Sequence, residues 1–494
     1  MSRLDFSQPR RQSVKGLILI FFQEGRNAIK IFWPLLVPLV LSKHSDNKLL
    51  FVGVALAAGV ILLMIHTILY YWKFLFYIEN QQFILRMGYL NRKTLTIPID
   101  RIQNVNTNQT LVQQFLHVMS VEIDTAGSSK KELKIHALSK PVAVQLAMEL
   151  SRYLESKQTV NQENETKPVP EEMLIMRLTN RDLLRIGISQ NHLQTAFLIF
   201  IFGIQFYNQV KEYFKEKAEQ YAQEAFEYIS QSGWAIISSM IVFFLILSFL
   251  YSMVRTLVLY YDLRLYKLNQ SYRIVSGLLN RKNLLIPFRK IQQLNWETGP
   301  VKKLFGIYKV NILQATSGVT VKTPQIELPG CLDKHIELLK SDLFGPDALK
   351  DKPVIHSNRV YFRRTWIYKG WVPAVLFSPL LFLDWRYILL LTGWILFMLI
   401  FSWQTLKKSY FQISNDQIRV SSGAISHKFK QMEFDKVQHL GFSQSIFYKK
   451  LGVASLEIGN ASGKITIPFI DVKIARALHD YLLYYAETSN RFWM

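Results

Sequence analysis

The sequence predicts an α+β membrane protein with six transmembrane helices arranged as three hairpins. Each hairpin is followed by a small antiparallel β domain that ends in a C-terminal helix. Three observations lead to this prediction. Long apolar runs occur in pairs, segments with strand-like alternation follow each pair, and one sequence pattern recurs behind every hairpin. A length of 494 residues also leaves room for roughly three domains.

The composition limits the class of protein. Half of the residues are apolar, only 19% are charged, and the formal net charge is +23. Such a chain is too apolar for an ordinary soluble enzyme or for a disordered protein. Its single cysteine, Cys331, excludes an intramolecular disulfide and a cysteine-based metal cluster, so we expect a small buried residue there. The composition indicates a multi-pass membrane protein with basic parts outside the membrane.

The three predicted hairpins are defined by paired apolar runs. These runs cover about residues 28–42 and 49–71, 193–207 and 234–254, and 366–383 and 387–403. A helix needs about 20 residues to cross the hydrocarbon core, and the second run of each pair meets this length best. The first and third hairpins open with shorter runs that contain prolines, among them Pro34 and Pro373. We nevertheless predict that all six runs cross the membrane.

Lysine and arginine predict the orientation. The N-terminal tail and the three long regions behind the hairpins are basic, whereas the loop at residues 208–233 is mainly acidic. The positive-inside rule therefore places both termini and the three β domains in the cytoplasm, in a multi-pass plasma-membrane protein. Aromatic residues near the inner boundary are candidate interfacial anchors: Tyr71, Trp72, Tyr260, Tyr261 and Trp403.

An internal repeat supports this organisation. The sequence GYLNRKTLTIPIDRIQNVN, residues 88–106, recurs as GLLNRKNLLIPFRKIQQLN at residues 277–295, with 11 of 19 positions identical. A weaker third copy, GAISHKFKQMEFDKVQHLG, covers residues 423–441. Each copy continues into a strand with a period of two, a turn, another strand and a helical segment.

The repeat predicts the following domain organisation. Residues 1–27 form a tail with an amphipathic lead-in, 28–72 hairpin 1, and 73–156 β domain 1. A linker and lead-in at 157–192 precede hairpin 2 at 193–258, with its external acidic loop, and β domain 2 at 259–345. A linker at 346–365 precedes hairpin 3 at 366–404 and β domain 3 at 405–494.

These motifs resemble the bacterial pleckstrin-homology-like membrane-flanked domain (DUF304) family. The resemblance rests on Gly-x-x-x-Arg-Lys, on Ile-Pro-x-x-x-Ile-Gln, and on the strand and glycine turn that follow. The overall plan resembles the long, three-domain member of a two-protein system of Bacillus-type bacteria. This implies pleckstrin-homology-like domains, a plasma-membrane location and a partner that is a shorter membrane protein with one related domain. It implies no catalytic residues. The third copy departs from the motif at His427 and Glu433.

The basic turn after each repeated glycine is the candidate site. Its residues Arg92, Lys93, Arg281, Lys282 and Lys428 lie beside predicted membrane segments, and each Lys or Arg near an anionic leaflet gains about 1 kcal/mol. The alternative is a solvated turn that is basic without a ligand. His66 is expected to be a hydrogen-bonded structural residue. We predict no metal site, no cofactor and no enzymatic activity, because the sequence contains no nucleotide-binding, zinc-protease or hydrolase motif.

Two classes of function remain. The first is a non-catalytic plasma-membrane scaffold, whose cytoplasmic domains bind membrane lipids of the inner leaflet or a partner membrane protein, in envelope integrity or in resistance to membrane-active agents. The alternative is a transporter or lipid-handling protein that uses the six helices as a pathway. Nucleic acid is not an expected partner, because the basic residues lie beside the apolar runs.

Overall fold

The computed structural model describes residues 4–41, 48–125, 133–156, 172–213, 234–315, 325–382 and 384–488. Residues 214–233 of the predicted acidic loop and residues 157–171 of the predicted linker and lead-in therefore lie outside the described residues. The chain divides into two compact units. One consists mainly of Met1–Leu174 and Asp262–Ile286, and the other mainly of Ile175–Tyr261, Pro287–Thr316 and Thr320–Met494.

The first repeat begins with two helices and continues with strands, as the sequence predicts. In chain order its elements are α1 (Gly16–Leu41), α2 (Lys48–Lys73), β1 (Leu75–Glu79), β2 (Gln82–Met87), β3 (Lys93–Pro98), β4 (Ile102–Thr110), α3 (Leu111–Phe115), β5 (Val118–Thr125), β6 (Leu133–Ser139) and α4 (Lys140–Ser156).

The second repeat has the same order, preceded by a strand and a lead-in helix. Its elements are β7 (Met173–Arg177), α5 (Asn180–Ile188), α6 (His192–Tyr213), α8 (Trp234–Tyr260), β8 (Arg264–Leu268), β9 (Ser271–Ser276), β10 (Asn280–Pro287), β11 (Ile291–Thr298), α9 (Pro300–Leu304), β12 (Tyr308–Gln314), β13 (Gln325–Cys331) and α10 (Asp333–Phe344).

The third repeat follows the same plan with a broken first helix. Its elements are β14 (Ile355–His356), α11 (Val360–Trp366), the π-helical η4 (Ile367–Trp371), α12 (Val372–Phe377), the 3₁₀ segment η5 (Ser378–Phe382), α13 (Tyr387–Lys408), β15 (Tyr410–Ile413), β16 (Gln417–Ser422), β17 (His427–Glu433), β18 (His439–Ser443), α14 (Ile446–Lys449), β19 (Val453–Asn460), β20 (Gly463–Asp471) and α15 (Val472–Thr488).

The prediction of six transmembrane helices is wrong. Among the described residues, two helices are long and apolar enough to cross a membrane, Ser238–Tyr260 and Tyr387–Lys408. Two shorter apolar stretches, Ala57–Lys73 of α2 and His192–Phe206 of α6, are also found within the described residues. The pairing of helices into hairpins is retained. The two arms have equal length in the first pair, α1 and α2, and unequal length in the second, α6 and α8, and the first arm of the third pair is broken.

Local chemistry explains the broken first arm of the third hairpin. In the third hairpin the first arm is divided into η4, α12 and η5, and Pro373 and Pro379 lie at the starts of the last two segments. Proline lacks the backbone N–H that a continuous helix needs and clashes with the preceding turn.

The β parts of the first and third repeats each enclose a core between two sheets and a terminal helix. Strand residues that alternate toward this core are fully buried, and the terminal helices α4 and α15 cover it with apolar side chains. In the first repeat the buried set includes Phe76, Phe83, Val121, Ile135 and Leu146. In the third it includes Ile418, Met432, Leu456, Ile465 and Ala475.

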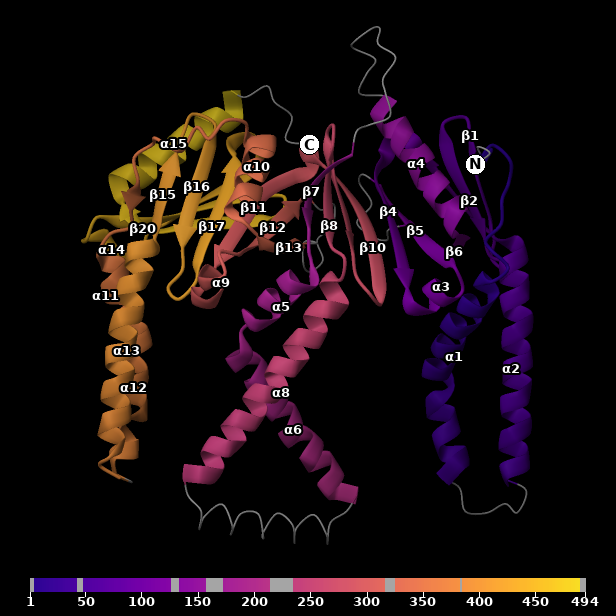
Figure 1. Ribbon diagram of the computed structural model, residues 1–494, viewed down its shortest axis with the longest axis horizontal. Helices are drawn as coiled ribbons and strands as arrows, with labels where there is room; N and C mark the ends of the chain where they lie inside the picture. Colours follow the sequence, from indigo (N-terminus) through magenta and orange to yellow (C-terminus); the bar gives the residue numbers. More distant parts are fainter. Residues whose placement is uncertain are drawn as a thin grey trace. The chain divides into compact units, whose positions relative to one another are not determined.

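The sheets are shared between successive repeats, which the sequence did not predict. The strand orders are β6-β5-β4-β10-β9-β8-β7 and β13-β12-β11-β17-β16-β15-β14, with β1-β2-β3 and β18-β19-β20 as separate three-stranded sheets. In Figure 1, β10 lies beside β4, and β17 lies beside β11. Each seven-stranded sheet thus combines three strands of one repeat with three of the next, plus the strand that precedes a hairpin.

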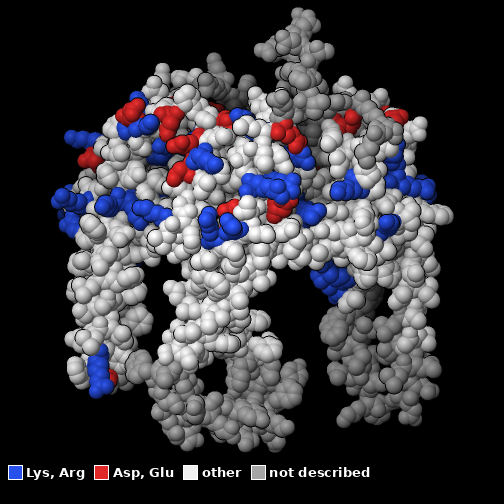
Figure 2. Space-filling model, in the orientation of Figure 1, with Lys and Arg blue, Asp and Glu red and all other residues white. Residues whose placement is uncertain are grey.

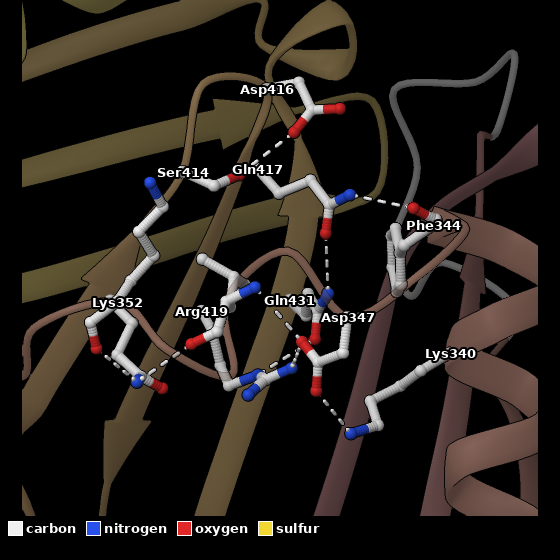
Figure 3. A network of polar contacts seen from close by, with 11 residues as sticks. Lys340, Phe344, Asp347, Lys352, Ser414, Asp416, Gln417, Arg419 and Gln431 are labelled. Carbon is white, nitrogen blue, oxygen red and sulfur yellow. Dashed lines mark hydrogen bonds and ion pairs between the residues drawn. The ribbon is translucent and has the colours of Figure 1, made fainter.

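A polar network connects the second repeat to the third (Figure 3). Asp347 accepts hydrogen bonds from Lys340 Nζ at 3.1 Å and from Arg419 Nη2 at 2.8 Å. Arg419 also donates to Gln431, which in turn donates to Gln417. Burial raises the pKa of Asp347, but the hydrogen bonds and charges of Lys340 and Arg419 outweigh this effect, so its pKa lies below the ordinary value. The network holds the segment after α10 against β16 and β17.

The backbone conformation explains why glycine occupies the same position in all three repeats. Gly88, Gly277 and Gly423 have φ values of 86°, 105° and 115°, in the region that glycine alone adopts at little cost. A Cβ atom at any of the three would collide with the carbonyl oxygen three residues later. The glycine therefore permits the tight turn that leads into β3, β10 and β17.

We expect Gly277→Ala to lower the free energy of unfolding by roughly 1–3 kcal/mol, the cost of a strained left-handed residue. The measurement is the thermal unfolding midpoint in detergent micelles. Gly299→Ala is the control, because Gly299 has φ −112° and nothing within 4 Å of an added Cβ. Equal losses in both variants would contradict this explanation of the repeated glycine.

Candidate membrane-contact surface

The turn after the repeated glycine lies at the membrane end of the first and third repeats. Strand β1 starts just after α2 ends, and β2 returns beside it, with Leu75 opposite Arg86. The β2–β3 turn is therefore next to the end of α2. The same path, with Tyr410 opposite Ser421, places the β16–β17 turn at the end of α13.

Hydrogen bonds hold these turns in place. In the first repeat, Tyr89 Oη lies 3.0 Å from Nδ1 of His66 in α2, so His66 is a hydrogen-bonded residue as the sequence predicts. In the third repeat, Lys408, the last residue of α13, donates from Nζ to the carbonyl oxygens of Ala424 and Ile425. Both turns are thereby attached to the helix that precedes their sheet.

The turn of the second repeat is held by the first repeat. Gln114 Nε2, in α3, donates to the carbonyl oxygens of Leu278 at 3.0 Å and Leu279 at 3.2 Å. A turn of one repeat thus contacts the short helix of the preceding repeat, next to the shared sheet edge.

Each turn presents an apolar side chain followed by basic ones. The apolar residue two positions after the glycine is Leu90, Leu279 or Ile425, and all three are exposed, Leu90 to 86%. The candidate residues Arg92, Lys93, Arg281, Lys282 and Lys428 are also exposed. Exposed leucine beside arginine or lysine is the composition of a segment that enters the interfacial layer of a membrane.

The basic turns differ in their charge partners. Among the described residues, Arg92, Lys93, Arg281 and Lys282 form no ion pair, whereas Lys428 lies 3.4 Å from Glu297. These four cations are therefore available to an anionic ligand, and the charge of Lys428 is partly compensated.

In the third turn, His427 replaces the arginine of the other copies. Its Nε2 lies 2.7 Å from Ser421 Oγ. Burial, together with the charges of Lys408 and Lys303, lowers its pKa. The third turn therefore offers less positive charge than the first two.

A short helix in each repeat adds further exposed apolar residues. Phe115 in α3 is 86% exposed, Leu304 in α9 is 84% exposed and Phe447 in α14 is 84% exposed. Figure 1 shows these helices at the end of the sheets from which the hairpin helices of their own unit extend. Large apolar side chains gathered at one end of the sheets indicate contact with an apolar phase.

The charge distribution agrees with this placement. In Figure 2, Lys and Arg gather where the helices leave the sheets, and on this face the described arms of the second and third hairpins are almost free of charged residues down to the tip of the third. The first arm, α1, carries Glu24, Arg26 and Lys30. Basic residues at the ends of apolar helices are the usual flanks of membrane segments.

The predicted aromatic anchors divide into two groups. Trp72, Tyr261 and Trp403 are exposed, and Lys407 Nζ lies 5.5 Å from the ring centroid of Trp403. Tyr71 is buried, and Tyr260 donates a hydrogen bond to Glu327 at 2.7 Å. Of the five predicted anchors, only the first group is exposed.

Sequence reasoning missed a polar pocket in the second repeat. A cavity of about 270 Å³ lies among α5, α6, α8, α9, β12 and β13, and its charged lining residues are Arg255, Lys302, Lys309 and Glu327. Glu327 accepts from Lys309 Nζ at 2.8 Å. Burial raises the pKa of Glu327, but Lys309 and Tyr260 outweigh this effect and the pKa lies below the ordinary value. Burial also lowers the pKa of Lys302. The single signal in the sequence was Arg255, a charge within an apolar helix.

Within the described part of the chain, no three His, Cys, Asp or Glu residues are grouped so as to hold a metal ion. Cys331 is free and buried, and burial raises the pKa of its thiol to about 12.

The exposed groups at the membrane end of the repeats are apolar and basic, which suits binding to an anionic surface.

We expect Glu327→Gln to destabilise the fold by about 1.5–3 kcal/mol, the usual value of hydrogen bonds to a charged group, because Lys309 and Tyr260 lose the carboxylate to which they donate. Thermal unfolding in detergent measures this loss. Glu337→Gln removes an exposed carboxylate in α10 and is the control, with little expected change. Equal stability of the two variants would show that Glu327 does not hold the pocket together.

Comparisons with known proteins agree with the repeated architecture. The family described as bacterial PH domain matches residues 34–154, 216–339 and 369–486, so each match includes helical and β parts of one repeat. The chain is also 24% identical over 462 residues to the UPF0699 transmembrane protein YdbT of Bacillus subtilis (strain 168), which covers 89% of this chain and 87% of the relative.

Proposed function

The chain belongs to the bacterial PH domain family, and from this premise we propose that it is a non-catalytic membrane scaffold whose repeats bind the membrane surface. The observation that carries the proposal is the turn of the first repeat. It presents exposed Leu90, Arg92 and Lys93 while Tyr89 is hydrogen-bonded to His66 of α2. The turn is thus held beside an apolar helix with its lipid-compatible side chains outward.

The energies favour contact with an anionic leaflet. Each Lys or Arg near such a leaflet contributes about 1 kcal/mol, and burying a large apolar side chain contributes about 1.5–3 kcal/mol. In the first repeat, the summed binding free energy exceeds the thermal energy several-fold, with contributions from Leu90, Phe115, Arg92 and Lys93. The alternative, a turn that is basic without a ligand, leaves the exposure of the apolar residues unexplained.

The helices support a membrane location. In the most apolar windows of Ser238–Tyr260 and Tyr387–Lys408, only 17% and 11% of the residues are buried inside the protein, so most of their apolar surface requires lipid. The relative from Bacillus subtilis carries the name of a transmembrane protein. We propose the plasma membrane, with the basic β repeats and both termini on the cytoplasmic side, as the positive-inside rule favours.

The cellular role proposed here is envelope integrity and resistance to membrane-active agents. A protein that attaches repeated domains to the inner leaflet reinforces the membrane without chemistry of its own. The resemblance to one member of a two-protein system supports a second proposal, a partner that is a shorter membrane protein with one related domain.

Environment-sensitive probes test the membrane contact. We expect the fluorophore NBD on Leu90→Cys or Phe115→Cys, in a Cys331→Ala background, to be quenched by nitroxide-labelled lipids when the full chain is in nanodiscs with phosphatidylglycerol. These side chains are placed to enter the interfacial layer.

The control for the probes is Glu79→Cys. Glu79 is exposed at the far end of β1, away from α2, and its probe should be quenched by aqueous quenchers alone. Aqueous quenching of the probes at positions 90 and 115 to the same degree as at position 79 would overturn the membrane-contact surface.

Complementation tests the cellular role. Cells that lack the chain should lose survival under membrane-active peptides, and the wild-type chain should restore it. We expect the variant with Arg92, Lys93, Arg281 and Lys282 changed to Gln to restore less survival at equal expression, because its attraction to anionic lipid is lost.

The matched control for this experiment is Lys350→Gln with Lys352→Gln. These exposed lysines lie near Gln412, which donates to the carbonyl oxygens of Leu349 and Lys352, and they belong to none of the basic turns. This control should restore full survival. Unchanged survival without the chain would contradict the envelope role, and full rescue by the four-residue variant would contradict the part of the basic turns.

A further inference from the structure

The two ends of the repeat array leave complementary sheet edges open. Inside the array, the third strand of a repeat pairs with the fourth strand of the repeat before it, as β10 does with β4 and β17 with β11. In the first repeat, the equivalent third strand is β3, and in the last repeat the equivalent fourth strand is β18. Among the described residues, no strand pairs with the outer edge of either.

The two internal junctions use the same register. Lys282, five residues after its repeated glycine, lies opposite Asn108, which is 20 residues after Gly88. Lys428, five residues after its glycine, lies opposite Glu297, which is 20 residues after Gly277. The next pair inward is Asn283 with Thr107 in one junction and Phe429 with Trp296 in the other. The repeat therefore encodes a fixed mode of edge pairing.

Residues that are buried at the internal junctions have exposed counterparts at the two open edges. Thr107 and Trp296 are 4% and 7% exposed, whereas Phe442, at the same repeat position in β18, is 37% exposed. At the opposing position, Phe429 stacks on Trp296 with ring centroids 5.2 Å apart, whereas Thr94 of β3 is exposed. An open edge with an exposed aromatic residue is a template for another strand.

From this match we propose that copies of the chain associate head to tail, with β18 of one copy paired antiparallel with β3 of the next. In the shared register, Phe442 lies opposite Thr94, Gly441 opposite Leu95 and Ser443 opposite Lys93. No like charges meet in these pairs. The contact continues an interface that the chain already forms twice, and this favours a second copy as the occupant.

This association goes beyond the proposed membrane contact and does not depend on it. The paired edges are different surfaces, so the contact is heterologous and leaves one open edge at each end of any dimer. Such contacts form rings or open filaments. The assembly therefore extends beyond two copies.

Cysteine crosslinking of the full-length protein in nanodiscs and native membranes tests the proposal. In a Cys331→Ala background, one tagged chain carries Thr94→Cys and a differently tagged chain carries Phe442→Cys. We expect oxidation to link the two chains to each other, because directly opposed residues of antiparallel strands are within reach of a disulfide. A chain with both substitutions should form a ladder of dimers and larger species.

Two controls fix the interpretation. Thr107→Cys with Asn283→Cys, a pair inside the first junction, should crosslink within one chain and confirms that the oxidation works. Leu95→Cys with Phe442→Cys shifts the register by one residue and turns one side chain to the other face of the sheet, so it should link poorly.

Three results would overturn the proposal. They are absence of links between chains when the Thr107–Asn283 control forms, links between two copies of the same single variant, and linkage of Thr94→Cys or Phe442→Cys to a different membrane protein instead of a second copy. A monodisperse elution profile of each variant before oxidation shows that the protein is folded. Loss of the NBD quenching described above would leave this result unaffected, so the two proposals fail separately.

Discussion

Backbone hydrogen bonding across the edges of neighbouring repeats is the constraint on which the β architecture depends. A strand at a sheet edge presents unpaired N–H and C=O groups, and a folded protein must pair, cover or blunt them. Here β10 pairs with the backbone groups at the edge of β4, and β17 pairs with those at the edge of β11. As a result, the strands of the middle repeat take part in two different sheets, and both neighbours are needed to complete them.

The membrane end of the first and third repeats follows from the same sheet geometry. The first strand of the β part leads away from the hairpin helix and the second strand returns beside it, so the turn after the second strand lies next to the end of that helix. This follows from the path of the strands and does not depend on their side chains. The repeated glycine makes that turn tight, and His66 and Lys408 bind it to the helix. An exposed leucine or isoleucine and basic residues are thereby held beside the end of an apolar helix, and this small set of turn residues is the basis of the proposed lipid contact.

Much of this organisation could be predicted from the sequence, because side-chain patterns record it. The three copies, their strand alternation, the terminal helices and the turn after the glycine all depend on side-chain periodicity or on φ. The edge pairing of β4 with β10 consists of backbone hydrogen bonds and leaves no such pattern. The Tyr260–Glu327 contact joins residues 67 positions apart, which no local motif indicates. In the third hairpin, the first arm was predicted as one span because its apolar composition was weighed above the proline breaks at Pro373 and Pro379.

The fixed register of the junctions bears on how such a chain can lengthen or shorten in evolution. Since the two internal junctions share one register, gain or loss of one whole unit is compatible with the same backbone pairing at the remaining junctions. Gain or loss of part of a unit would instead leave a strand without its pairing strand. Copy number can therefore drift between related proteins while the boundaries of the unit stay constant, and the middle copy is the most readily duplicated because both of its sides are already accommodated.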